Sequence, residues 1–72
     1  MTSYDEAARG LSTRELRVLQ LAADGRTNAQ IAKELSVSPS AVQGDLDSVY
    51  VKLDVADRAN AIANALQAGL IS

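Results

Sequence analysis

The chain has no cysteine and no histidine, and these two absences remove much of the usual catalytic and metal-binding chemistry. Ser-His and Cys-His nucleophilic sites cannot be built, and neither can a zinc site with histidine or thiolate ligands. A disulfide is excluded as a source of stability. The carboxylates Asp45 and Asp47 do not fill the gap, because residues two apart on a helix do not face each other. We therefore expect no enzyme, no cofactor and no metal site.

Aromatic residues and long apolar runs are also scarce. Tyr4 and Tyr50 are the only aromatic residues, so a core has to be built from Leu, Ile, Val and Ala. Hydrophobic residues make up 47% of the 72 positions, which is enough for one small domain. No apolar stretch approaches the roughly 20 residues that cross a bilayer, and residues 1–10 lack the apolar run of a signal peptide. We expect a cytoplasmic protein that does not bind membranes.

Positive charge is in short supply. Seven Lys and Arg residues stand against nine Asp and Glu residues, and the formal net charge is −2. A nucleic-acid binder usually carries a basic face, because phosphate contacts provide most of the non-specific affinity. The charge balance therefore disfavours tight non-specific DNA binding.

The hydrophobic periodicity and the capping residues predict an all-α domain of four helices and no strands. The expected helices cover residues 13–24, 28–35, 39–53 and 58–68. Each begins after a residue whose side chain can cap a helix: Ser12, Thr27, Ser38 and Asp57. Glu15 and Gln30 complete capping boxes with the first two caps. Gly25 and Gly69 are placed to stop the first and last helices.

Apolar positions at helical spacing predict which faces are buried. The second expected helix turns Ile31 and Ala32 inward, and Val37 in the following turn plugs the core. The third helix carries a stripe of Val42, Leu46, Val49 and Leu53. In the last helix, Ala59, Ile62 and Leu66 are expected to face the core, with Leu70 packing after the stop. A second row, Ala61, Ala65 and Ala68, is then left for close contact with another helix.

A short helix, a tight turn and a second helix over residues 27–53 have the layout of a helix-turn-helix. The sequence resembles the LuxR-type (GerE/FixJ/NarL-like) DNA-binding domain over residues 11–71. The resemblance is carried by LSTRELRVLQLAADGRTNAQIAKELSVSPSAV at 11–42, VKLDVADRANAIANAL at 51–66 and GLI at 69–71. We assign residues 11–72 to this domain and residues 1–10 to a flexible lead-in or linker remnant.

The resemblance implies a function and partners. It implies a bacterial transcription regulator, such as a response-regulator output domain, whose third helix enters the major groove of duplex DNA. It also implies a homodimer formed through the fourth helix, and an upstream receiver or sensor domain in a longer protein. A free-standing short regulator is the alternative organisation.

The third expected helix departs from the pattern of the family. Where the family usually shows Thr-Val-Lys-x-His, this chain has Ala41, Gln43 and Asp45 at the Thr, Lys and His positions. Asp47 and Val51 replace further polar or basic residues. The charges over residues 39–53 are two aspartates and Lys52, a sum of −2 + 1 = −1. Carboxylates near phosphates repel them, so weakened DNA affinity is expected.

The residues expected at DNA are Thr27, Asn28, Lys33, Ser38, Ser40, Gln43, Gly44, Asp47 and Lys52. Gln43 has the amide that can pair with adenine, and Gly44 would let the helix lie close to the groove floor. The cations and the helix-start residues would hold the phosphate backbone. For the serines and threonine, local capping is the competing interpretation, and for the charged residues it is plain solvation.

The alanine row Ala61, Ala65 and Ala68 is the predicted dimer seam, because small side chains let two helices approach closely. An exposed, helix-favouring face is the competing interpretation. A second functional hypothesis uses the same fold as a protein-interaction module. In that case the acidic third helix or the alanine-rich fourth helix binds another regulator, with weak or no DNA binding.

Overall fold

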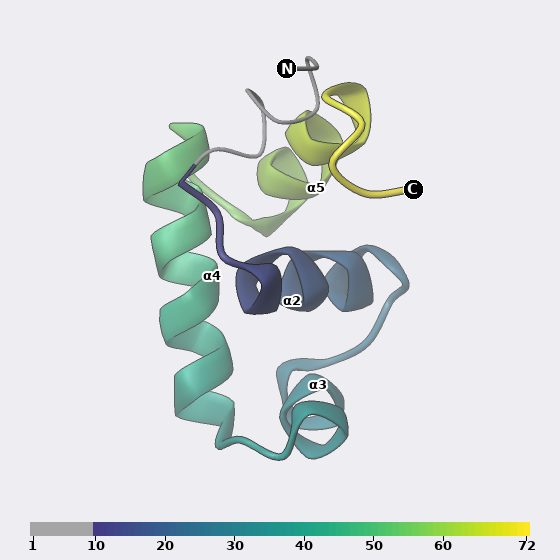
Figure 1. Ribbon diagram of the computed structural model, residues 1–72, viewed down its shortest axis with the longest axis vertical. Helices are drawn as coiled ribbons and strands as arrows, with labels where there is room; N and C mark the ends of the chain where they lie inside the picture. The colour runs from purple at the N-terminus through teal and green to yellow at the C-terminus, as the bar shows by residue number, and fades with distance from the viewer. Residues whose placement is uncertain (1–9) are drawn as a thin grey trace.

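A computed structural model describes residues 10–72, and four α-helices lie within this range (Figure 1). They are α2 (Thr13–Ala23), α3 (Asn28–Leu35), α4 (Pro39–Leu53) and α5 (Arg58–Gln67). The long α4 runs along one side of the molecule, and α2 lies across it between α3 and α5 (Figure 1). No strand occurs in residues 10–72, and the all-α prediction is confirmed. The predicted lead-in lies outside the described residues, apart from Gly10.

The helix starts follow the predicted caps. Ser12 Oγ accepts a hydrogen bond from the Glu15 N–H at 3.0 Å, and Glu15 Oε1 accepts from the Ser12 N–H at 2.7 Å. Thr27 and Gln30 form the same reciprocal pair. The side chains of Ser38 and Asp57 cap α4 and α5. These bonds pair backbone N–H groups that have no partner inside a helix.

All four helices end with a residue in the left-handed region. Glycine fills this position after α2 and α5, at Gly25 and Gly69. Ser36 and Asp54 fill it after α3 and α4, with φ of 59° and 56°. The next N–H then turns back to a helix carbonyl, as Val37 N does to Ala32 O at 2.9 Å. The first and last helices end one residue earlier than predicted.

Two clusters of buried side chains form the core, and α2 contributes to both. The first cluster joins α2, α3 and α4 and contains Val18, Ala22, Ile31, Ala32, Val42 and Leu46. The second joins α2, α4, α5 and the C-terminal segment and contains Leu19, Val49, Ala61, Ala65, Leu70 and Ile71. Val37 packs against the first cluster, as predicted. Both the helix-turn-helix and the C-terminal helix α5 therefore pack against α2.

The predicted inward face of α5 is wrong for Ala59 and Leu66, while Ile62 and Leu70 pack against the core as predicted. Ala61 and Ala65 are completely buried, whereas Ala59 is exposed and Leu66 is 47% exposed. Ile62 is half-buried and packs against both clusters. Alanine at the contact lets the backbone of α5 approach α2 and α4 closely. Close packing of the helices therefore determines which side of α5 faces the core, more than the hydrophobicity of single residues does.

The predicted dimer seam is wrong for the same reason. The side chains of Ala61 and Ala65 are enclosed within the monomer, so they cannot reach a second molecule. Of that row, Ala68 is exposed. A dimer formed through α5 would have to use other residues.

No helix in the described part of the chain combines the length and apolarity needed to cross a membrane.

Candidate nucleic-acid interface

The solvent-facing side of α4 is continuous along the helix. Five exposed residues follow helical spacing on it, and we call them the outer face of α4: Ser40, Gln43, Gly44, Asp47 and Val51. The opposite side carries Val42, Leu46 and Val49, all at most 1% exposed. The helix is therefore anchored on one side and free on the other along most of its length.

Gly44 lies in the middle of the outer face. A Cβ atom added at this position would meet no atom of residues 10–72 within 4 Å, apart from the adjacent residues and the backbone of α4 itself. The glycine therefore does not serve helix packing inside the domain. Its lack of a side chain leaves the centre of the outer face open.

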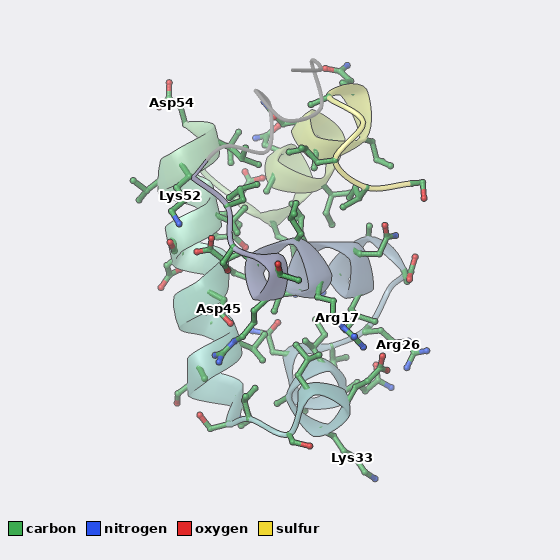
Figure 2. All side chains as sticks on the ribbon, viewed as in Figure 1. Arg17, Arg26, Lys33, Asp45, Lys52 and Asp54 are labelled. Carbon is green, nitrogen blue, oxygen red and sulfur yellow. The ribbon has the colours of Figure 1, made fainter. Side chains whose placement is uncertain are left out.

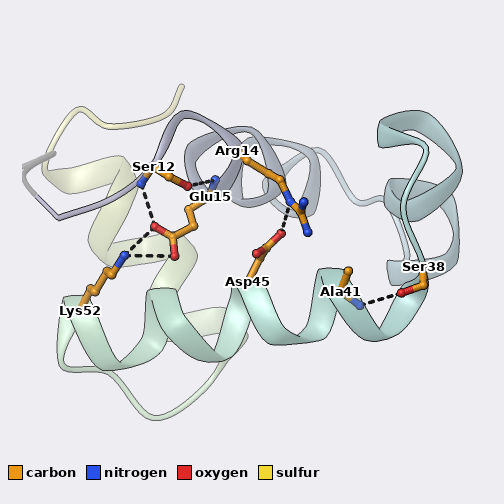
Figure 3. A network of polar contacts seen from close by, with 7 residues as sticks. All are labelled: Ser12, Arg14, Glu15, Ser38, Ala41, Asp45 and Lys52. Carbon is orange, nitrogen blue, oxygen red and sulfur yellow. Dashed lines mark hydrogen bonds and ion pairs between the residues drawn. The ribbon is translucent and has the colours of Figure 1, made fainter.

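Asp45 does not present a free negative charge, contrary to the expectation from the sequence. Its Oδ2 atom lies 2.6 Å from Nε of Arg14 on α2, and its side chain is only 21% exposed (Figure 3). Because Arg14 is 47% exposed, solvent screens this pair, and its contribution to stability is at most about 1 kcal/mol. The pair nevertheless neutralises one of the two acidic residues of α4.

Lys52 is bound to a buried carboxylate. Its Nζ atom lies 2.9 and 3.2 Å from the two oxygens of Glu15, which is 6% exposed (Figure 3). Burial by itself raises the pKa of Glu15, but hydrogen bonds from Lys52, the Ser12 N–H and Ser48 outweigh burial and lower the pKa below its ordinary value of 4.5. Lys52, predicted as a phosphate contact, is in the first place the counterion of Glu15.

Gln43 belongs to a chain of hydrogen bonds that links three helices. Arg58 Nη1 donates to Asn28 Oδ1 at 2.8 Å, and Asn28 Nδ2 donates to Gln43 Oε1 at 3.0 Å. Gln43 Nε2 then donates to Asp47 Oδ1 at 2.9 Å. Arg58 also donates to the carbonyl oxygen of Arg26. The structure thus brings together the predicted site residues Asn28, Gln43 and Asp47.

Thr27, Ser38 and Lys33, also predicted at DNA, are not part of these hydrogen bonds. Thr27 and Ser38 use their hydroxyl oxygens as caps, and each retains an O–H that can donate to a phosphate. Within residues 10–72, Lys33 makes neither an ion pair nor a side-chain hydrogen bond, and it points away from α3 (Figure 2). Arg17 and Arg26 share the carboxylate of Glu34 at 3.9 and 3.4 Å. These three cations are free or only weakly paired.

Sequence reasoning missed Arg14 and Arg58 as parts of the site. Arg14 lies 31 positions from Asp45, and Arg58 lies 30 positions from Asn28. Both arginines fall inside the motifs that carry the family resemblance, and this was the available signal. No group of histidine, cysteine or acidic residues in the described range is arranged to hold a metal ion.

The short α3, the turn at Ser36 and the long α4 with its free outer face define a helix-turn-helix domain. A family model described as bacterial regulatory proteins of the luxR family matches residues 9–65. The chain belongs to this family, and its four-helix domain is the one the resemblance implied. Membership in a family of regulatory proteins also supports the prediction that it is not an enzyme.

Relatives of this chain are transcriptional regulators. It is 44% identical over 61 residues to the probable transcriptional regulatory protein NarL of Mycobacterium tuberculosis, covering 85% of this chain and 28% of that protein. It is 38% identical over 66 residues to the transcriptional regulatory protein DesR of Bacillus subtilis, covering 92% of this chain and 33% of that protein. The chain thus spans about a third or less of the length of these regulators.

Solved structures share the fold. The transcription factor GerE superposes with a TM-score of 0.83 at 29% identity, over 86% of this chain and 92% of that chain. The response regulator ChrA of a heme-sensing two-component system gives a TM-score of 0.82 at 40% identity, over 88% of this chain and 31% of that chain.

Proposed function

We propose that this domain binds duplex DNA through the outer face of α4 and thereby regulates transcription in the bacterial cytoplasm. The observation that carries the proposal is a helix with one fully buried side and one free side, supported at its start by α3. The major groove of B-DNA is about 12 Å wide and admits such a helix. The names of the related regulators support the same role.

Phosphate contacts in this proposal come from the surroundings of α4. Lys33 is free to meet a phosphate, and the hydroxyl groups of Thr27, Ser38 and Ser40 lie at or near helix starts. Arg17 and Arg26 are held only weakly by Glu34 and can exchange it for a phosphate. Glu15 already takes two of the hydrogen bonds that Lys52 can donate, so we expect a smaller share from it.

The oligomeric state and the domain context are part of the proposal. A homodimer through α5 would use the exposed side of that helix, on which Leu66 is the large apolar residue. A receiver or sensor domain preceding this domain in a longer protein would supply the signal. The partial coverage of the related regulators supports this arrangement.

Fluorescence anisotropy of a labelled mixed-sequence duplex, measured from low to physiological salt, tests DNA binding. We expect affinity that falls steeply as salt increases, because counterions are released when cations meet phosphates. Lys33→Gln should reduce the slope of log affinity against log salt by about 1, while the matched control Lys33→Arg should keep it. No binding at low salt would refute the proposal.

A second candidate function is a protein-interaction module on the same face. Two observations favour it: Val51 is 80% exposed, and Asp47 makes no ion pair within residues 10–72. Asp47→Lys separates the candidates. In DNA binding it should raise the affinity for a mixed-sequence duplex, because a repulsive charge becomes an attractive one. In protein binding it should abolish capture of the partner and need not create DNA affinity.

A further inference from the structure

The hydrogen-bond chain from Arg58 to Asp47 fixes the orientation of the Gln43 amide. Gln43 accepts at Oε1 from Asn28 and donates at Nε2 to Asp47. Rotating the amide by 180° would place two N–H donors against each other at Asn28 and two oxygens against each other at Asp47. Every bond in the chain also donates in the same direction, from a cation to an anion, so the bonds strengthen one another.

The fixed amide keeps one free donor and one free acceptor. An amide oxygen has two acceptor positions and an amide nitrogen has two N–H groups, and the chain uses one of each on Gln43. Adenine in the major groove presents the complementary pair, the N7 acceptor and the N6 amino donor. The Gln43 amide therefore retains the two kinds of group that an adenine pairs with.

Asp47 adds an acceptor beside this amide. An ionised carboxylate has no hydrogen to donate, so the atoms it can pair with on base edges are amino groups. Cytosine N4 and adenine N6 are the amino groups in the major groove, whereas guanine and thymine present O6, N7 and O4 acceptors there. Guanine is most often read by Arg or Lys, and the outer face of α4 has neither.

From these contacts we infer that the outer face of α4 selects bases with amino groups, with adenine opposite Gln43 and cytosine or adenine opposite Asp47. The inference rests on the proposed DNA binding and adds its base chemistry. Arg58 and Asn28 are positioning residues in this arrangement. In this arrangement they act on the bases through Gln43. Arg58 makes no ion pair within residues 10–72, and its other side-chain hydrogen bond goes to the carbonyl oxygen of Arg26.

The test begins with selection from duplexes that carry a randomised core, using the whole 72-residue chain at low salt. Selected duplexes are then measured by anisotropy with single adenines replaced by purine, which lacks the N6 amino group. Single cytosines are replaced by 2-pyrimidinone, which lacks the N4 amino group. The same replacements outside the footprint control for weakened base pairing.

We expect the removal of one amino group to weaken binding by about 5- to 150-fold at a contacted position. Gln43→Ala should abolish this sensitivity at an adenine, and Asp47→Ala should abolish it at a neighbouring position. Arg58→Lys, which lacks the planar fork that holds Asn28 and the Arg26 carbonyl together, should reduce the ratio between the adenine and purine duplexes. Arg17→Lys is the matched control, since it makes the same charge-keeping replacement at an arginine outside the hydrogen-bond chain. It should leave the ratio unchanged.

Three results would overturn the inference. Selected sites with guanine at the positions that depend on Gln43 and Asp47 would refute it, and so would amino-group sensitivity that survives both alanine variants. Either result leaves DNA binding intact, so the proposed function would stand. If the wild-type chain enriches and binds no duplex at low salt, the proposed function fails and this inference fails with it. Circular dichroism of each variant separates these results from loss of folding.

Discussion

Replacing Lys52 with methionine removes the counterion of Glu15 while keeping most of the apolar stem of the side chain. Removing one partner of a buried ion pair costs about 3–5 kcal/mol, because the other charge stays buried. Two features reduce the cost here. The side chain of Lys52 is 37% exposed, and Glu15 keeps the Ser12 N–H at 2.7 Å. We therefore expect the free energy of unfolding to fall by about 1–3 kcal/mol. A core of this size supplies only about 3–5 kcal/mol in total.

Urea unfolding followed by circular dichroism measures this loss, and its pH dependence identifies the cause. The pKa of Glu15 in the folded protein is lower than its ordinary value of 4.5. The stabilisation by its ionised form is therefore present above pH 4.5 and disappears as the pH falls through the lower, folded-state pKa. The cost of Lys52→Met should shrink in the same window, because a protonated Glu15 needs no cation.

The double variant Glu15→Gln with Lys52→Met is the control, since it has no buried charge to strand. It should be more stable than Lys52→Met alone at neutral pH. The reasoning is refuted if Lys52→Met costs less than about 0.5 kcal/mol, the range of an ordinary surface substitution. It is equally refuted if the cost is the same at neutral pH and well below pH 4.5.

Three further substitutions have clear expected outcomes. Ser36→Gly should stabilise the domain by roughly 0.5–1 kcal/mol in urea unfolding, because glycine adopts the left-handed conformation without a Cβ clash; lower stability would contradict this. Gly44→Ala should stabilise α4 by about 1 kcal/mol and should lower the DNA affinity measured by anisotropy. An unchanged affinity would mean that α4 does not lie close to the groove floor. Ala65→Leu should lower the melting temperature through a loss of about 1–3 kcal/mol from overpacking, whereas Leu66→Ala should change the melting temperature little in the monomer. If Leu66→Ala lowered the melting temperature more than Ala65→Leu, Leu66 would face the core as the sequence predicted.

The features predicted correctly from the sequence depend on interactions between residues close in the chain. Ser12 with Glu15 and Thr27 with Gln30 are three positions apart, so their types and spacing are enough to predict the capping boxes. The left-handed residue at Ser36 was harder to foresee, because serine lacks the conformational signal that glycine provides at Gly25.

The missed features depend on how helices approach one another. Arg14 with Asp45 and Lys52 with Glu15 pair across 31 and 37 positions, and no local pattern predicts which cation meets which carboxylate. The sum of −1 over residues 39–53 is not altered by these pairs, because Arg14 offsets Asp45 and Glu15 offsets Lys52. What the charge count could not show is that Asp47 is the residue of α4 whose charge has no counterion within residues 10–72. In α5, the apolar positions at helical spacing favoured Ala59, Ile62 and Leu66 as the inward face, although the close helix contact is made by the smaller side chain of Ala65.

The central position of α2 has a consequence for how the domain loses its structure. Val18 and Leu19 are neighbours in the chain, both are completely buried, and they belong to different core clusters. If α2 unwinds, both clusters lose a wall at the same moment, so neither can persist as a separate stable unit. Slow amide hydrogen exchange in α4 and α5 should then report one shared opening free energy, and the domain should melt in a single cooperative step.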